Sequence, residues 1–163
     1  MSQTPRGLTR FNTGTVDERE LVALAAQLAR GAQSGGVIHL SGDLGAGKTT
    51  FARALLVELG IHDRIKSPTY SLIESYRAGT LDIHHLDLYR IADAAELEWL
   101  GVADLCGPQT LLLIEWPERG GNALPRADLS IEFLHVGDGR KLSAIAASAG
   151  GEAMLTSWRN ILV

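Results

Sequence analysis

The sequence predicts a three-layer α/β domain, in which helices cover both faces of a mixed β-sheet. A short β-prone run at residues 37–40 leads through a glycine-rich segment into a helical pattern. A fully apolar run at residues 111–114 has the length of a strand that is buried on both faces, as in a sheet between two helical layers. Helix patterns and hairpin signals alternate along the rest of the chain, which indicates a mixed sheet.

The N-terminal part is expected to contain a helix, a strand and a second helix. Asp17 and Glu20 have the spacing of a capping box, and the apolar residues after them repeat on one helical face, so a helix is predicted over residues 17–30. Residues 37–40, Val-Ile-His-Leu, are typical of a strand. Residues 48–59 carry the second helical pattern, with apolar side chains at positions i, i+4 and i+8.

The middle of the chain is expected to form a hairpin followed by a short helix. The β-prone residues 67–76 and 81–88 flank an Arg-Ala-Gly-Thr turn at residues 77–80. A helix is predicted over residues 94–100, and it should end near Gly101 because glycine commonly terminates helices.

The C-terminal part is expected to supply a central strand, a second hairpin and a terminal helix. The apolar run at residues 111–114 is the central strand. Residues 129–136 and 141–147 flank Gly-Asp-Gly at residues 137–139, which is a hairpin signal. Residues 152–161 are expected to form a terminal helix.

Length and composition limit the possible classes of protein. The chain has 163 residues and a mass of 17.5 kDa, so we expect a flexible tail at residues 1–10 and a single domain over residues 11–163. Hydrophobic residues make up 45% and charged residues 21%, which argues against disorder and against a coiled coil. No apolar run approaches the roughly 20 residues that span a bilayer. We also expect no signal peptide, because residues 1–10 lack an apolar core.

Cysteine and charge content narrow the location and the partners. Cys106 is the only cysteine, so no internal disulfide can form, and a cytoplasmic location is the default expectation. The formal net charge is −4, whereas proteins that bind nucleic acid usually carry a basic excess. The chain is therefore not expected to bind nucleic acid by itself, and no membrane contact is expected.

A phosphate-binding motif lies between the predicted strand at 37–40 and the predicted helix at 48–59. Residues 42–49, Gly-Asp-Leu-Gly-Ala-Gly-Lys-Thr, match G-x-x-x-x-G-K-[ST], the P-loop motif, at every fixed position. Glycines let successive backbone N–H groups curl around a phosphate, and the helix N-terminus favours the same anion. A chance match in a glycine-rich turn is the alternative, but strand, loop and helix occur in the required order. The candidate nucleotide-binding residues are Gly42, Asp43, Leu44, Gly45, Ala46, Gly47, Lys48, Thr49 and Thr50.

Two carboxylates are candidates for the metal site and for catalysis. Lys48 can reach the β- and γ-phosphates, and the Thr49 hydroxyl can ligate Mg²⁺. Glu115 ends the central strand at the sheet edge where open α/β folds bind ligands, so it can bind Mg²⁺ or polarise the attacking water. Asp87 is the second candidate. The alternatives are that Glu115 is only a solvated carboxylate and that Asp87 only ends a strand or caps a helix. Asp43 is expected to hold the loop or to face water. The catalytic candidates are Glu115, Asp87 and Lys48. The candidate metal ligands are Thr49, Glu115 and Asp87. Either Glu115 or Asp87 could be the general base.

Three further features carry weaker signals. Residues 67–70, Ser-Pro-Thr-Tyr, form either a switch whose hydroxyl senses the γ-phosphate or a plain loop. His84 and His85 are adjacent on a predicted strand and point to opposite faces, so we expect core or surface histidines and no shared metal. Trp116 is either a packing residue or part of the site, since it adjoins Glu115.

Taken in order, four sequence blocks resemble the TsaE family, also called YjeE: residues 42–50, 67–70, 85–90 (His-Leu-Asp-Leu-Tyr-Arg) and 115–117 (Glu-Trp-Pro). The resemblance implies a P-loop NTPase-like fold and a Mg²⁺-dependent ATPase, slow in isolation, that is needed for threonylcarbamoyladenosine at position 37 of tRNAs reading ANN codons. It implies ATP and Mg²⁺ as cofactors, a TsaD-type transferase and a TsaB-type companion as partners, and only indirect contact with tRNA. It also implies that residues 11–16 form the wall of the adenine pocket.

Three alternatives remain open at this point. A small-molecule P-loop kinase usually has an arginine-bearing lid, and the sequence has no arginine-rich segment of that kind. A GTPase commonly recognises guanine through N-K-x-D, which this sequence lacks. A nucleotide-gated adaptor, in which slow hydrolysis is incidental, is barely distinguishable from an ATPase by sequence.

Overall fold

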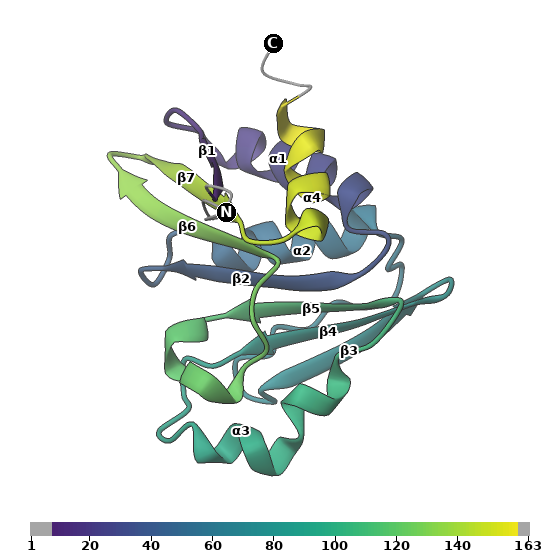
Figure 1. Cartoon of the computed structure of the whole chain (residues 1–163). Helices are drawn as coiled ribbons and strands as arrows, with labels where there is room; N and C mark the ends of the chain where they lie inside the picture. The colour runs from purple at the N-terminus through teal and green to yellow at the C-terminus, as the bar shows by residue number, and fades with distance from the viewer. Residues whose placement is uncertain (1–7, 160–163) are drawn as a thin grey trace, which may run out of the picture.

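One twisted sheet forms the centre of the molecule (Figure 1). The computed structural model describes residues 8–159, and within them seven strands are hydrogen-bonded in the order β1-β7-β6-β2-β5-β4-β3. The strands are β1 (Thr9–Asn12), β2 (Gly36–Gly42), β3 (Ile73–Ala78), β4 (Leu81–Asp87), β5 (Thr110–Glu115), β6 (Leu129–Val136) and β7 (Gly139–Ala146).

The sheet is mixed, as predicted. The central strand β2 runs parallel to β5 on one side and to β6 on the other, and β4 is parallel to β5. The β3–β4 and β6–β7 hairpins are antiparallel, and β1 pairs antiparallel with β7. The apolar run of β5 thus lies between two parallel neighbours, which is why it has no polar face.

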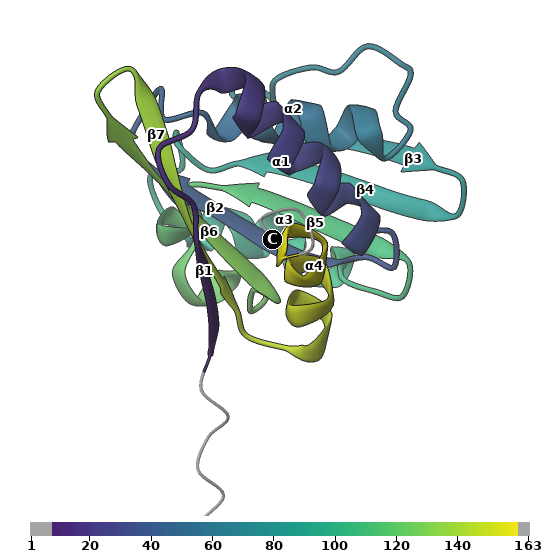
Figure 2. The same cartoon turned by 90° about the horizontal axis from the view of Figure 1, so that it is seen from above.

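Helices cover both faces of the sheet, which confirms the three-layer α/β prediction (Figure 1). One face carries three helices, and in the view from above α1 and α2 lie across the strands while α4 packs beside α1 (Figure 2). The opposite face carries the short α3 and single 3₁₀ turns. The helices are α1 (Glu18–Gly31), α2 (Lys48–Glu58), α3 (Ala95–Leu100) and α4 (Ala149–Arg159). None of the helices between residues 8 and 159 is long and apolar enough to cross a bilayer.

A hydrophobic core lies on each side of the sheet. The larger one is buried beneath α1, α2 and α4 and includes Trp158, whose indole N–H donates to the Leu24 carbonyl oxygen at 2.8 Å. The smaller one lies on the face of α3, around Leu97. Because strand residues alternate between faces, the odd-numbered residues of β4 and β5 point toward α2 and the even-numbered ones toward α3.

Three expectations about the elements need correction. Residues 67–72 are turn and loop and not strand, since the Leu72 N–H donates to the Pro68 carbonyl oxygen at 2.8 Å and Leu72 has a φ of 73°. The terminal helix starts at Ala149, before the predicted 152, and residues 160–163 lie outside the described part. Of the predicted tail at residues 1–10, Thr9 and Arg10 belong to β1, and residues 1–7 lie outside the described part.

Candidate functional site

The glycine loop joins the end of β2 to the start of α2, as the motif predicts. Gly42, Gly45 and Gly47 have φ values of 138°, 78° and 106°, and residues other than glycine rarely adopt such positive values. A Cβ on Gly42 would overlap the Phe133 carbonyl oxygen, and a Cβ on Gly47 would lie 2.9 Å from the Leu21 side chain. The backbone path of the loop therefore requires glycine at both positions.

Lys48 is the first residue of α2, and it is only 4% exposed. Its Nζ donates to the carbonyl oxygens of Gly42 and Asp43, the latter at 2.8 Å, and lies 4.3 Å from the centroid of the Trp116 ring. Burial lowers the pKa of the Lys48 ammonium, and the carboxylate of Glu115 offsets part of that effect. The loop carbonyls and an aromatic face thus hold this cation at the loop.

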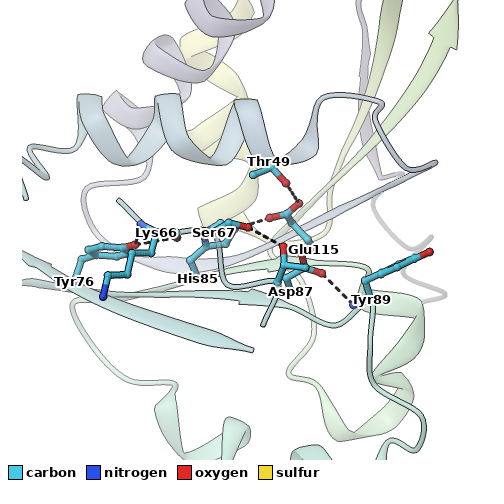
Figure 3. Close-up of polar contacts among 9 residues, drawn as sticks. Thr49, Lys66, Ser67, Tyr76, His85, Asp87, Tyr89 and Glu115 are labelled. Atoms are coloured by element: carbon cyan, nitrogen blue, oxygen red, sulfur yellow. Dashed lines mark hydrogen bonds and ion pairs between the residues drawn. The ribbon is translucent and has the colours of Figure 1, made fainter. Parts of the chain in front are cut away.

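Two carboxylates meet at the carboxyl end of the parallel strands. Asp87 and Glu115 are the last residues of β4 and β5, they are register partners, and both point toward α2. The hydroxyl of Thr49 in the first turn of α2 donates to Glu115 Oε1 at 2.8 Å (Figure 3). The structure therefore brings the three predicted metal-ligand candidates together.

Each carboxylate has further partners. His85 Nε2 lies 2.7 Å from Glu115 Oε2 (Figure 3). Asp87 accepts a hydrogen bond from the Tyr89 backbone N–H at 3.0 Å and one from the Thr69 hydroxyl at 3.3 Å. Thr69, in the segment with the predicted switch, is thereby tied to the carboxylate cluster.

A cavity of about 360 Å³ lies between the loop, the first turn of α2 and the ends of β4 and β5. We call it the P-loop cavity. Among the residues predicted for the site, those that line it are Leu44, Gly45, Gly47, Lys48, Thr49, Thr50, Asp87 and Glu115. Gly42 ends β2, Asp43 offers its backbone carbonyl to Lys48, and the Ala46 side chain is buried in the core. These three residues shape the loop without lining the cavity.

The donor atoms in this cavity fit Mg²⁺ by type. A hydroxyl and two carboxylates are hard oxygen ligands, and Mg²⁺ is commonly held by one or two carboxylates together with waters and substrate phosphates. Within residues 8–159 there is no cluster of three or more His, Cys, Asp or Glu side chains that could hold a metal. These residues therefore do not form a complete set of protein ligands for a metal. They suit a metal whose remaining ligands are phosphate oxygens and waters.

The sequence assigns no role in the site to two polar residues beside the loop, His85 and Arg140. His85 was considered only as half of a histidine pair, yet it contacts Glu115, while His84 points to the other face and bonds to Ser75 Oγ at 2.7 Å. Because His85 and Asp87 are two residues apart on one strand, their side chains point to the same face, and this spacing could have placed His85 beside the site. Arg140 lies against Gly47, and its buried Nε has no hydrogen-bond partner among residues 8–159.

Trp116 belongs to the site. Its ring packs at a tilt of 50° against Tyr89, with a centroid distance of 4.9 Å, and the Lys48 ammonium lies over its face. Its φ of 58° is a conformation that bulky residues seldom adopt, and such strain is typical of functional sites. Arg90 lines the same cavity, and its guanidinium lies 4.3 Å from the Tyr70 ring centroid.

A glycine loop that joins a central parallel strand to a helix, with carboxylates at the ends of the neighbouring strands, is the arrangement of P-loop NTPase-like proteins, and the chain is of this class.

Comparisons with known proteins identify the family. The TsaE family, described as threonylcarbamoyl adenosine biosynthesis protein TsaE, matches residues 15–142. The chain is 40% identical over 124 residues to the tRNA threonylcarbamoyladenosine biosynthesis protein TsaE of Haemophilus influenzae, covering 76% of this chain and 78% of that protein. It is 37% identical over 141 residues to the TsaE of Bacillus subtilis, covering 86% and 88%. The crystal structure of Bacillus subtilis YdiB superposes with a TM-score of 0.73 at 30% identity, covering 94% of this chain and 97% of that one.

This chain belongs to the TsaE family, and its role lies in the biosynthesis of threonylcarbamoyladenosine in tRNA.

Proposed function

We propose that this protein binds ATP with Mg²⁺ in the P-loop cavity and hydrolyses it to ADP and phosphate. One observation carries the proposal: the Thr49 hydroxyl lies 2.8 Å from the buried Glu115 carboxylate, in the same cavity as Lys48 and Asp87. Burying these charged groups together is unfavourable unless they serve a charged ligand or pair with one another. A triphosphate with its metal is complementary to this combination of one ammonium and two carboxylates.

The residues divide the work according to their chemistry. Lys48 and the loop from Gly45 to Thr50 bind the phosphates, and Lys48 exchanges loop carbonyls for phosphate oxygens. Thr49, Glu115 and Asp87 hold Mg²⁺, which when bound neutralises charge that develops on the phosphate oxygens. Glu115 or Asp87 orients and deprotonates the attacking water. The guanidinium of Arg140 is a further donor for phosphate, because the side chain lies against Gly47 and its Nε has no hydrogen-bond partner among residues 8–159.

The adenine is expected to lie near the segment that leads into α1. A hollow of about 320 Å³, largely apolar, is lined by Thr13, Gly14, Thr15 and Val16 together with α1. Val16 bridges to Arg140, which in turn lies against Gly47, so this hollow adjoins the loop. Phe11 packs on Trp158 in the core, with ring centroids 5.6 Å apart, and so the proposed adenine wall is limited to residues 13–16.

The proposed partners are a TsaD-type transferase and a TsaB-type companion. The energy of hydrolysis would serve the complex that installs threonylcarbamoyl on adenosine 37 of tRNAs reading ANN codons, and this chain would contact tRNA only indirectly. Membership in the TsaE family supports the pathway, and the net charge of −4 supports coupling through protein partners. Tyr70, 85% exposed beside the Thr69–Asp87 contact, lies where a partner could sense the nucleotide.

The test compares binding and turnover in carboxylate variants. Calorimetric titration with ATP, with and without Mg²⁺, is combined with phosphate release. Glu115→Gln should keep Mg²⁺-free ATP binding and lose turnover, because an amide is a poorer ligand and base. Asp87→Asn should be impaired in the same way. If wild-type protein binds no ATP, or if both variants turn over at the wild-type rate, the proposal is wrong.

A further inference from the structure

The carboxylate of Glu115 is held at both of its oxygens. Oε1 accepts from the Thr49 hydroxyl at 2.8 Å, and Oε2 lies 2.7 Å from His85 Nε2 (Figure 3). The side chains of His85 and Glu115 are each 2% exposed. Water does not compete for a contact buried this deeply, so the hydrogen bond is strong and well oriented.

The sheet register creates this contact. His85 and Asp87 are two residues apart on β4 and share the face that points toward α2, while Asp87 pairs with Glu115 on the neighbouring β5. The imidazole therefore contacts Oε2 of Glu115, the oxygen that does not accept from Thr49. His84, the adjacent residue, points to the opposite face and bonds Ser75 instead.

The surroundings of the ring select one tautomer. A carboxylate oxygen accepts, so Nε2 carries the proton and donates it to Oε2. His85 Nδ1 is buried with no hydrogen-bond partner among residues 8–159.

We propose that His85 is a positioning residue for Glu115: by holding Oε2, it fixes the carboxylate so that Oε1 faces Thr49 and the P-loop cavity. A histidine that orients a ligating or basic carboxylate narrows the geometries open to that group. Without the imidazole, the carboxylate rotates about its terminal bond, and the oxygen presented to the cavity is no longer defined. The consequence for turnover rests on the proposed ATPase function; the contact and its tautomer do not.

The experiment uses two variants of His85 and one matched control. His85→Leu removes the donor, His85→Gln restores an N–H donor on a side chain of similar reach, and His84→Gln changes the neighbouring histidine on the opposite face. For each purified protein, kcat and KM for MgATP, the Kd for ATP without Mg²⁺ and the melting temperature are measured. Side-chain ¹H–¹⁵N NMR of the nucleotide-free wild type reports the tautomer of His85.

The positioning role predicts a split between these readouts. His85→Leu should lose about 10–100-fold in kcat, the range usual for residues that orient a metal ligand, while Mg²⁺-free ATP affinity is unchanged. His85→Gln should recover most of the loss, His84→Gln should match wild type, and the NMR should show the Nε2–H form. Equal impairment of the Leu and Gln variants, or wild-type kcat in His85→Leu, would overturn the proposal.

The failure of the proposed function has a different signature. If the wild type shows no ATP turnover, the ATPase proposal fails, and the NMR measurement then decides the contact by itself. An Nδ1–H tautomer in the wild type overturns the role of His85 whether or not ATP is hydrolysed.

Discussion

Lys48 is the cation on which the proposed phosphate binding depends. Its ammonium is shared among the Gly42 and Asp43 carbonyls and the Trp116 ring, so it is already placed at the loop. We expect Lys48→Ala to weaken ATP binding, with and without Mg²⁺, by at least about tenfold, or ~1.4 kcal/mol. Calorimetric titration measures this, and Lys141→Ala, which removes an exposed lysine of β7, is the control. Unchanged affinity in a folded Lys48→Ala protein would show that the motif does not bind phosphate here.

Thr49 should act through the metal and not through phosphate charge. Its hydroxyl is the group that faces Glu115, so Thr49→Ala removes a proposed metal ligand and leaves the loop backbone intact. The expected result is normal ATP affinity without Mg²⁺ and loss of the gain in affinity and turnover that Mg²⁺ provides. Thr49→Ser keeps the hydroxyl and should behave as wild type. A Mg²⁺ titration that is identical for the Ala and Ser variants would contradict the assignment.

Two partly buried histidines should make stability depend on pH. Partial burial lowers the pKa of His39 and of His84 below the ordinary value. A hydrogen bond to the Pro125 backbone and the charge of Glu118 offset part of this effect for His39, and the charge of Asp82 offsets part of it for His84. The unfolded chain therefore binds more protons than the folded one as the pH falls below about 6.5, so the free energy of unfolding decreases with acidification.

Urea unfolding at about pH 7.5 and about pH 5.5, on either side of the ordinary histidine pKa, measures this loss of stability. The double variant His39→Gln/His84→Gln should lose less stability than wild type over the same interval. An equal loss in both proteins would mean that these histidines do not contribute.

The site residues differ in how far the sequence could predict them. The loop, Lys48 and Thr49 are contiguous, so a motif captures their arrangement, and Glu115 follows from its place at the end of an apolar strand. His85 and Arg140 depend on strand register and on long-range packing, which one sequence does not specify. The positions that local pattern defines were predictable; those that tertiary pairing defines were not.

At the scale of elements, the same distinction explains the errors. Strand β1 is a four-residue edge strand with alternating half-buried and exposed positions, and its pairing with β7 joins residues far apart in the chain. Residues 67–72 contain β-prone threonine and tyrosine, but Pro68 has no backbone N–H to donate to a ladder, and the turn closed by Leu72 takes priority. The capping of α1 was predictable because it is local: Asp17 accepts from the Glu20 N–H at 2.8 Å.

The start of α4 is fastened to the sheet by Asp128. Its two carboxylate oxygens accept from the Val37 N–H and from the Ser148 hydroxyl, each at 2.7 Å. The Ser148 oxygen in turn accepts from the Gly151 N–H at 3.1 Å, which caps the helix. The helix backbone therefore approaches the Asp128 main chain closely at Gly151.

Two neighbouring glycines in α4 should respond to alanine in opposite directions. A Cβ on Gly151 would overlap the Asp128 carbonyl oxygen, whereas the nearest atom to a Cβ on Gly150 is Ser148 Oγ at 3.6 Å. We expect Gly151→Ala to lose about 1–3 kcal/mol through overpacking. Gly150→Ala should be neutral or up to about 1 kcal/mol more stable, since alanine favours helix. Urea unfolding of both variants decides this, and a stabilised Gly151→Ala protein would contradict the close approach.

At the scale of the whole molecule, the loop at residues 66–70 connects the P-loop cavity, which Thr69 lines, with the protein surface, where Tyr70 is exposed. The segment at residues 66–69 is anchored by the Tyr76 hydroxyl, which accepts from the Lys66 backbone N–H at 3.1 Å (Figure 3). The Thr69 hydroxyl anchors it a second time by donating to Asp87. Tyr70 follows directly and is exposed, with Arg90 stacked on it. A change in the hydrogen bonds of Asp87 can therefore reach the exposed Tyr70 through Thr69 alone.

Hydrolysis by the isolated chain should be slow, and the proposed partners should accelerate it. Arg90, which lines the cavity, lies against the Tyr70 ring, and Arg119 lies against the Tyr89 ring, so neither is committed to a phosphate. An arginine finger contributes about 10³–10⁵ in rate, so a chain in which Arg90 and Arg119 are both engaged elsewhere is expected to turn over slowly. A partner that binds the exposed Tyr70 would release Arg90 toward the cavity it already lines.

The measurement is steady-state phosphate release with and without a purified TsaB–TsaD pair, together with a pull-down in ATP and in ADP. We expect the pair to raise the rate by at least about tenfold, which corresponds to ~1.4 kcal/mol of transition-state stabilisation. Retention of the pair should differ between ATP and ADP, because the nucleotide would change the contacts of Asp87 with Thr69. Arg90→Ala should keep the slow basal rate and lose the acceleration, while Lys48→Ala removes both. If rate and retention are indifferent to the pair and to the nucleotide, coupling through Tyr70 and Arg90 is wrong, and a phosphoryl acceptor other than water becomes the next candidate to test.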